Sequence, residues 1–183
     1  MPPDSIENID KVLTEQLVLL EKQISELRFT ENFVFTLGDN FDLNLLASLQ
    51  YSGVYLVEIK TNPSFATIQD WITDFLIKWE DDKYIANFVP NSRISRVRKH
   101  SEFKTWFPIY LGRAKNISGR IKMHIFKEMN KPTGALKLRE RVNIHGCEFR
   151  ISTIKVNVEN YDLIVPQVER YFRNEINPIL GRQ

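Results

Sequence analysis

A strand that runs directly into a helix is encoded by residues 108–124, which read PIYLGRAKNISGRIKMH. The apolar and aromatic run from Pro108 to Leu111 is typical of a strand. Asn116 is a residue type that caps helix N-termini, and the apolar residues that follow recur at helical spacing, at Ile117, Ile121 and Ile125. We therefore expect a strand, a short turn and a helix in this stretch, with His124 on a related face of the helix.

Further strands and helices flank this unit. Residues 53–59 form a β-branched and aromatic run that predicts the first core strand, and residues 149–156 predict the third. Pro166 fits the first turn of a final helix that continues to about Glu175, and Pro178 ends it. Between the first two strands, the insert 61–106 contains one helix, predicted from apolar residues at Ile68, Trp71, Ile72, Phe75, Leu76 and Trp79. Trp71 and Trp79 are expected in the core, whereas the basic run 91–100 fits a strand or an exposed loop.

Residues 4–28 predict a long amphipathic helix. Its apolar residues recur at steps of three and four, at Ile6, Ile9, Leu13, Leu17, Leu20, Ile24 and Leu27. The pattern is close to a heptad but slips between Leu13 and Leu17. Its partner is either the domain's own core or a second copy of the chain, and we expect packing on its own domain. Residues 29–50 are expected to be irregular, with a short helix at 43–49.

This order of elements indicates an α/β (α+β) fold with a small mixed or antiparallel sheet of three strands flanked by helices. We divide the chain into an N-terminal helical extension, residues 1–50, and a domain formed by residues 51–183. With 183 residues, 43% of them hydrophobic, the chain suits one compact domain and leaves no room for a second large one.

Composition limits the class of protein. Cys147 is the one cysteine, which excludes an internal disulfide and favours a reducing compartment. No apolar run reaches the roughly 18 residues of a membrane-spanning helix, and the acidic start lacks the basic region of a signal peptide. We expect a cytoplasmic protein without a membrane partner or an organic cofactor.

Charge is segregated along the chain. Residues 1–50 hold nine acidic side chains against three basic ones, whereas residues 91–141 hold fourteen Lys or Arg against three Glu. A block with this excess of positive charge favours binding of a phosphate backbone through counterion release. A charged surface without a ligand is the alternative. The DNA-binding candidates are Arg93, Arg96, Arg98, Lys99, Lys115 and Lys122.

Two tripeptides carry a family resemblance. Gly53-Val54-Tyr55 and Tyr110-Leu111-Gly112 resemble the signatures of the GIY-YIG nucleases, and residues 110–124 continue that family's pattern. Glu169 stands nine residues before Pro178, as the metal-binding glutamate of the family stands before its proline. The resemblance covers residues 53–59 and 108–180 and implies a GIY-YIG-type domain with catalytic residues Tyr55, Tyr110, Arg120, His124 and Glu169.

The resemblance also implies roles. Glu169 would bind Mg²⁺, or Mn²⁺ in its place, and Arg120 would bind the phosphate oxygens on which negative charge builds. Either Tyr55 or Tyr110 would activate or position the water, and His124 would hydrogen-bond a tyrosine or shuttle its proton. Arg113 would be a supporting cation. Taken singly, these residues have structural alternatives: strand tyrosines pack, a lone histidine is usually structural, and a helical Glu169 pairs with Arg173.

We therefore expect a metal-dependent endodeoxyribonuclease, with a type II restriction-like enzyme that cuts double-stranded DNA as the leading form. A symmetric homodimer is the economical arrangement for cutting two strands. One alternative is a nuclease for branched or damaged DNA. Another is a catalytically inactive DNA-binding module, favoured by Gly181, which stands where the family has an asparagine.

Overall fold

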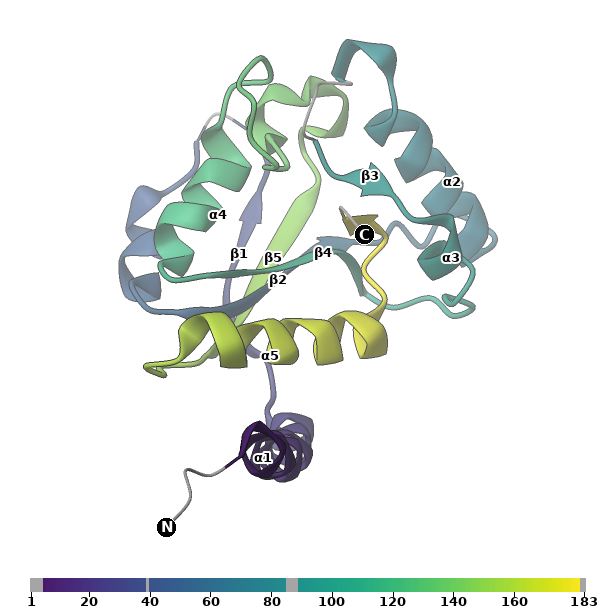
Figure 1. Cartoon of the computed structure of the whole chain (residues 1–183). Helices are drawn as coiled ribbons and strands as arrows, with labels where there is room; N and C mark the ends of the chain where they lie inside the picture. Colours follow the sequence, from purple (N-terminus) through teal and green to yellow (C-terminus); the bar gives the residue numbers. More distant parts are fainter. Residues whose placement is uncertain (1–4, 39, 85–88, 182–183) are drawn as a thin grey trace.

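The centre of the computed structural model, which describes residues 5–38, 40–84 and 89–181, is an antiparallel sheet. Its four strands lie in the order β1-β5-β2-β4, with bounds β1 (Thr30–Thr36), β5 (Glu148–Lys155), β2 (Gly53–Lys60) and β4 (Trp106–Ala114). Helices flank the sheet on both faces (Figure 1), which confirms the α/β class. The sheet has one strand more than the sequence predicted.

The additional strand is β1, in a stretch expected to be irregular. It pairs with β5 alone, and its side chains alternate, so that Phe33 and Phe35 are buried between exposed neighbours. The short helix expected at 43–49 is the 3₁₀ helix η1 (Leu43–Leu49), which buries Leu46 and Leu49 in the same core. Residues 30–36 and 43–49 therefore pack with the sheet and core formed by the chain after residue 50.

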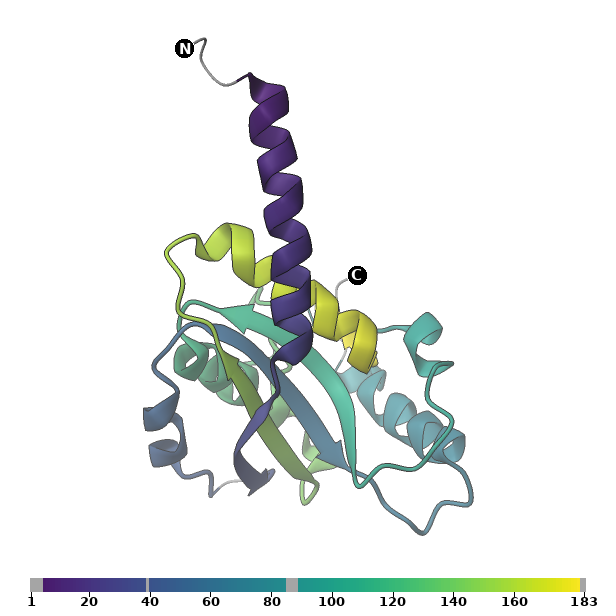
Figure 2. The ribbon, with the colours of Figure 1, turned by 90° about the horizontal axis from the view of Figure 1, so that it is seen from below.

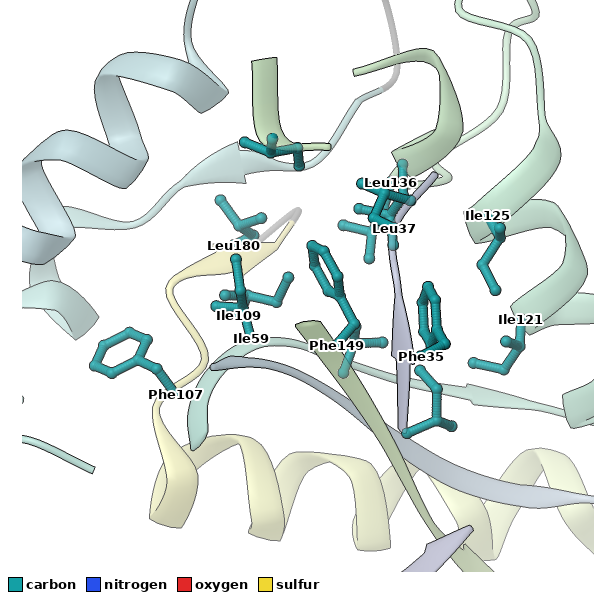
Figure 3. Close-up of a cluster of buried hydrophobic side chains, with 14 of the residues drawn as sticks. Phe35, Leu37, Ile59, Phe107, Ile109, Ile121, Ile125, Leu136, Phe149 and Leu180 are labelled. Atoms are coloured by element: carbon teal, nitrogen blue, oxygen red, sulfur yellow. The ribbon is translucent and has the colours of Figure 1, made fainter. Parts of the chain in front are cut away.

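Two layers of helices enclose the sheet. The helices α2 (Ile68–Trp79) and α4 (Ile117–Phe126) cover one face, where Ile59, Ile109 and Phe149 meet Ile121 and Ile125 (Figure 3). The helix α5 (Tyr161–Ile176) covers the other face, over a smaller cluster that includes Val54, Leu56, Val165, Val168 and Phe172. The strand β2 is buried on both faces, which explains its continuous apolar sequence.

The insert is tied to the C-terminal segment. As expected, α2 buries Trp71 and Trp79. After η2 (Asp82–Tyr84), the basic run contains the short strand β3 (Asn91–Ser92) and one helical turn, α3 (Ile94–Val97). Strand β3 pairs with β6 (Leu180–Gly181), and the Ile179 amide donates to the Pro108 carbonyl at 3.3 Å. These segments therefore lie beside β4, the outer strand of the sheet.

The connector after α4 contains the 3₁₀ helices η3 (Leu138–Glu140) and η4 (Val142–Ile144). The final helix begins earlier than predicted, because Tyr161 precedes Pro166 and Pro166 lies inside α5. Pro166 has no N–H, so it cannot donate the helical hydrogen bond to the carbonyl of Asp162, an exposed residue. As expected, α5 ends just before Pro178, at a left-handed Asn177.

The N-terminal helix α1 (Ile6–Glu26) confirms the predicted helix but not its packing. Only its C-terminal end contacts α5, and Ile24 is its single buried residue (Figure 2). The N-terminal half projects from the domain, so the expected packing of this helix on its own core is wrong for most of its length. Neither α1 nor any other described helix is long and apolar enough to cross a membrane.

Candidate active site

A pocket of about 350 Å³ lies at the outer strand β4. Five of the six residues predicted for the site line it: Tyr55, Tyr110, Arg113, Arg120 and Glu169. They come from elements on both faces of the sheet, because Arg120 belongs to α4 and Glu169 to α5. The edge position of β4 is what allows side chains from the two helical layers to meet.

The local sequence explains how α4 begins beside the pocket. The Asn116 side chain accepts a hydrogen bond from the Gly119 amide at 2.9 Å, which confirms the predicted N-cap. Arg120 and His124 lie four residues apart and therefore project from the same side of the helix. Both reach the hydroxyl of Tyr55 on β2.

Tyr55 and His124 form the buried part of the site. The Tyr55 hydroxyl lies 2.7 Å from His124 Nε2, and Arg120 Nε donates to it at 3.4 Å. The Leu136 amide donates to His124 Nδ1 at 3.0 Å. Burial, with a smaller effect of Arg120, holds the pKa of His124 well below its usual value, so the ring is neutral at pH 7.

These bonds determine the direction of the contact with Tyr55. Because Nδ1 accepts the Leu136 amide proton, the single proton of the neutral ring is on Nε2, which donates to Tyr55. His124 in this form cannot take a proton from Tyr55. Burial and the neighbouring Tyr110 also raise the pKa of Tyr55 well above its usual value. Tyr55 is therefore a neutral phenol that accepts from two donors.

Gly112 provides the space for Tyr55. The two residues face each other across β2 and β4, and a Cβ at position 112 would lie 2.4 Å from the Tyr55 hydroxyl. Gly53 meets a similar constraint, because a Cβ there would lie 2.1 Å from the Ile154 carbonyl oxygen. The glycines of both tripeptides are thus required by close approaches.

Glu169 is held between two arginines. Arg113 Nη1 and Arg173 Nη2 each donate to one of its carboxylate oxygens at 2.7 Å. Its side chain is only 13% exposed and lines the pocket. The helical pair with Arg173, which the sequence offered as the alternative, therefore forms together with a contact from β4.

Positive charge dominates the pocket. Arg96 from the insert and Arg173 from α5 line it together with Arg113 and Arg120, against the single carboxylate of Glu169. Burial, Arg173 and Arg93 all lower the pKa of Arg96. Guanidinium groups gathered around one carboxylate favour an anionic ligand such as a phosphodiester.

Comparison of the chain with protein-family models, with curated proteins and with solved structures gave no match.

Two arginines that line the pocket, Arg96 and Arg173, were not predicted from the sequence as part of the catalytic site. Arg96 was predicted only as a DNA-binding residue, and Arg173 only as a partner of Glu169. Arg96 reaches the pocket because α3 follows β3, which pairs with β6 beside β4. The i,i+4 spacing from Glu169 was the available signal for Arg173.

The other predicted DNA-binding residues are dispersed. Arg93 Nε donates to the Gly181 carbonyl, and Lys115 pairs with Asp162 at 2.8 Å. Arg98, Lys99 and Lys122 are exposed. Not all of the fourteen Lys and Arg side chains of residues 91–141 lie on the surface. Lys137 and Arg141 are buried and donate to backbone carbonyls.

The residues present limit how a metal could bind. No group of three His, Cys, Asp or Glu capable of holding a metal occurs in the described part of the chain. Glu169 offers carboxylate oxygens, the ligand type that Mg²⁺ prefers, and each retains a lone pair beside its arginine bond. Gly181 lines the pocket without a side chain, so the asparagine expected from the resemblance has no equivalent at that position.

Proposed function

We propose that this chain is a metal-dependent DNA endonuclease of the GIY-YIG type. The observation that carries the proposal is the pocket at β4, which is lined by four arginines, one glutamate and two tyrosines, with two of the arginines bonded to the glutamate. Hydrolysis of a phosphodiester needs neutralisation of phosphate charge, a positioned water and stabilisation of the leaving oxygen. The pocket contains a residue suited to each requirement.

Arg120 is the proposed phosphate ligand. Its Nη2 donates to the Gly134 carbonyl at 2.9 Å, and its Nε points at Tyr55, so the planar group is held by two contacts. A guanidinium fixed in this way loses little side-chain entropy when phosphate oxygens bind its remaining donors. Charge stabilisation by a preorganised donor is often the largest contribution to catalysis of this kind.

We assign different roles to the two tyrosines. Tyr55 is 1% exposed and accepts hydrogen bonds from His124 and Arg120, so its own proton is available as a donor. Tyr110 is only partly buried and lines the pocket beside it, with the rings 6.2 Å apart. Tyr110 is therefore the better candidate for orienting the attacking water. His124 acts through Tyr55 and is a positioning residue.

Glu169 is the proposed metal ligand. A hydrated Mg²⁺ needs only one or two carboxylates when substrate phosphate supplies further oxygens. When bound, Mg²⁺ would supply Lewis-acid stabilisation of the charge that develops on phosphate oxygens. The surrounding arginines repel a dication, so we expect Glu169 to bind the metal only after a phosphodiester has entered the pocket.

Incubation of the protein with mixed-sequence double-stranded DNA and Mg²⁺, followed by sequencing of the ends, tests the proposal. We expect Mg²⁺-dependent cleavage, and Glu169→Gln should abolish it while DNA binding persists. Glu159→Gln removes a carboxylate just before α5 and serves as the control. Undiminished cleavage by Glu169→Gln would contradict the assignment of the metal ligand, and DNA binding without cleavage by the wild type would favour the inactive module.

The same experiment separates the enzyme alternatives. Discrete ends at one sequence indicate a restriction-like enzyme. Scattered ends, with preference for nicked or branched duplexes in a matched panel, indicate a structure-specific nuclease. The proposed pocket chemistry is common to both, because it acts on the phosphate and not on the base edges.

A further inference from the structure

The exposed half of α1 carries apolar side chains that the described part of the chain leaves uncovered. Seven of the large exposed apolar side chains lie between Ile6 and Leu19, including Ile6 at 82% and Leu13 at 48% exposure. Scattered apolar residues on a surface are ordinary. A stripe of them along a helix that projects from the domain, as α1 does (Figure 2), indicates an interaction surface.

The stripe continues from a covered region into an uncovered one. Its residues Ile24 and Leu27 pack against the α5 layer, Leu20 is only partly covered there, and Ile6, Ile9 and Leu13 extend beyond the domain. A groove of about 380 Å³ lies where α1 leaves α5, lined by Leu17 and Leu20 on one side and by Arg170 and Tyr171 on the other. A partner that covers the stripe would therefore also enter this groove.

From these features we infer that α1 pairs with α1 of a second copy of the chain, in an antiparallel, two-fold symmetric dimer. The stripe at Ile6, Ile9, Leu13, Leu17 and Leu20 has steps of three, four, four and three residues, which read the same in both directions. Antiparallel pairing about Leu13 places Ile6 opposite Leu20 of the partner subunit and Ile9 opposite Leu17 of the partner subunit. The slip in the heptad is the feature that makes the stripe self-complementary in this way.

Charge argues against nucleic acid or an anionic membrane as the occupant. The helix carries Glu7, Asp10, Glu15, Glu21 and Glu26 against Lys11 and Lys22, so it repels phosphate groups. Asp10 borders the stripe, three residues before Leu13, and would approach the exposed Arg170 at the groove of the second copy. A parallel pair would instead bring both domains to the end of the helix where α5 already covers the stripe.

Measurement of the mass of the protein in solution, by sedimentation equilibrium or light scattering at micromolar concentration, tests the dimer. We expect twice the chain mass of 21.6 kDa for the wild type and a monomer for Leu13→Glu. The matched control, Leu19→Glu, changes an exposed residue away from the stripe and should remain dimeric. Circular dichroism should be unchanged in both variants. A monomeric wild type, or equal dissociation by the control, overturns the inference.

Cysteine cross-linking tests the orientation. In a Cys147→Ala background, Leu13→Cys should form a disulfide-linked dimer, because the two residues meet at the symmetry axis. Ile6→Cys should not, because antiparallel helices separate these positions by about 21 Å, fourteen residues at ~1.5 Å each. Efficient cross-linking at Ile6 would overturn the antiparallel arrangement. Neither experiment measures cleavage, so its result is independent of the proposed function.

Discussion

The pocket at β4 and the projecting half of α1 differ in what holds them in place. The side chains of the pocket are fixed by neighbours, since Tyr55, His124 and Arg120 bond one another and Glu169 bonds two arginines. The stripe of α1 has no such neighbours in its N-terminal half. One region therefore has a rigid framework with excess positive charge, and the other has apolar surface that lacks a cover.

The difference indicates which partner each region requires. An anion neutralises excess guanidinium charge. Exposed aliphatic surface is instead removed from water by contact with another apolar surface. If the two regions serve separate partners, changes in one should leave the behaviour of the other unchanged. The following predictions test that independence, in order of decreasing expected effect.

The largest effect is expected for Arg120→Ala. Removal of a preorganised charge-stabilising donor should lower the cleavage rate at saturating DNA by about 10²–10³-fold. Single-turnover kinetics measure the rate, and sedimentation should report an unchanged mass. An exposed residue on the same helix, Lys122→Ala, should weaken DNA binding without lowering this rate. Equal loss of rate in both variants would contradict the special role of Arg120.

Gly112→Ala should destabilise the fold at the pocket. The added methyl meets the buried Tyr55 hydroxyl, and overpacking of this kind costs about 1–3 kcal/mol. Urea unfolding measures the change in free energy. Gly119→Ala is the control, because the nearest atom to a Cβ there is at 3.7 Å and alanine favours a helix. A Gly112→Ala protein as stable as the wild type would show that Tyr55 can move without cost.

His124 should make stability depend on pH in the acidic range. Its pKa in the folded state is depressed by burial, so the unfolded chain binds a proton first as the pH falls. The stability that neutral His124 contributes is complete above its unfolded pKa near ~6.5 and is lost as the pH falls towards the folded pKa, by at most about 1.4 kcal/mol per pH unit.

Urea unfolding at pH 7.5 and 5.5 measures this dependence. His124→Gln should reduce the difference between the two pH values. Part of the difference should remain, because burial also lowers the pKa of His100. An identical pH dependence in the variant would mean that the pKa of His124 is not depressed in the folded state, which would contradict a neutral ring whose Nδ1 accepts from the Leu136 amide.

The smallest effect is expected from inorganic phosphate. An anion that binds the arginine pocket at ten times its dissociation constant should stabilise the protein by about 1.4 kcal/mol. Thermal unfolding with added phosphate measures the shift. Arg173→Gln should diminish it, whereas Leu13→Glu should not. Equal stabilisation of both variants would indicate a general salt effect and not a bound anion.

Local sequence was sufficient for most elements but not for β1. The helices α2 and α4 and the strand β2 follow from periodicity, caps and β-branched runs that act over a few residues. Strand β1 is short and polar on one face, and its partner β5 lies more than a hundred residues away. Pairing at that separation leaves only a weak local signal, so β1 could not be predicted from its own residues.

The sequence by itself determined which residues have the chemistry for the pocket. The spacing of Arg120 and His124 on α4 fixes their common side, and the tripeptides supply the tyrosines and glycines. Tertiary structure decided which other residues lie next to these side chains in the pocket. Arg96 enters from the insert, Arg113 bonds Glu169 across 56 residues, and the amide of Leu136 sets the proton position on His124.

In helix α1 too, the sequence determined one property and the tertiary structure another. Its amphipathic pattern determined that a helix would form and that one stripe would need a cover. Whether the stripe packs inward depends on how α1 crosses α5, which covers only the C-terminal end of α1 (Figure 2). Periodicity reports the shape of one element, whereas the surface that element meets is set by contacts between segments far apart in the chain.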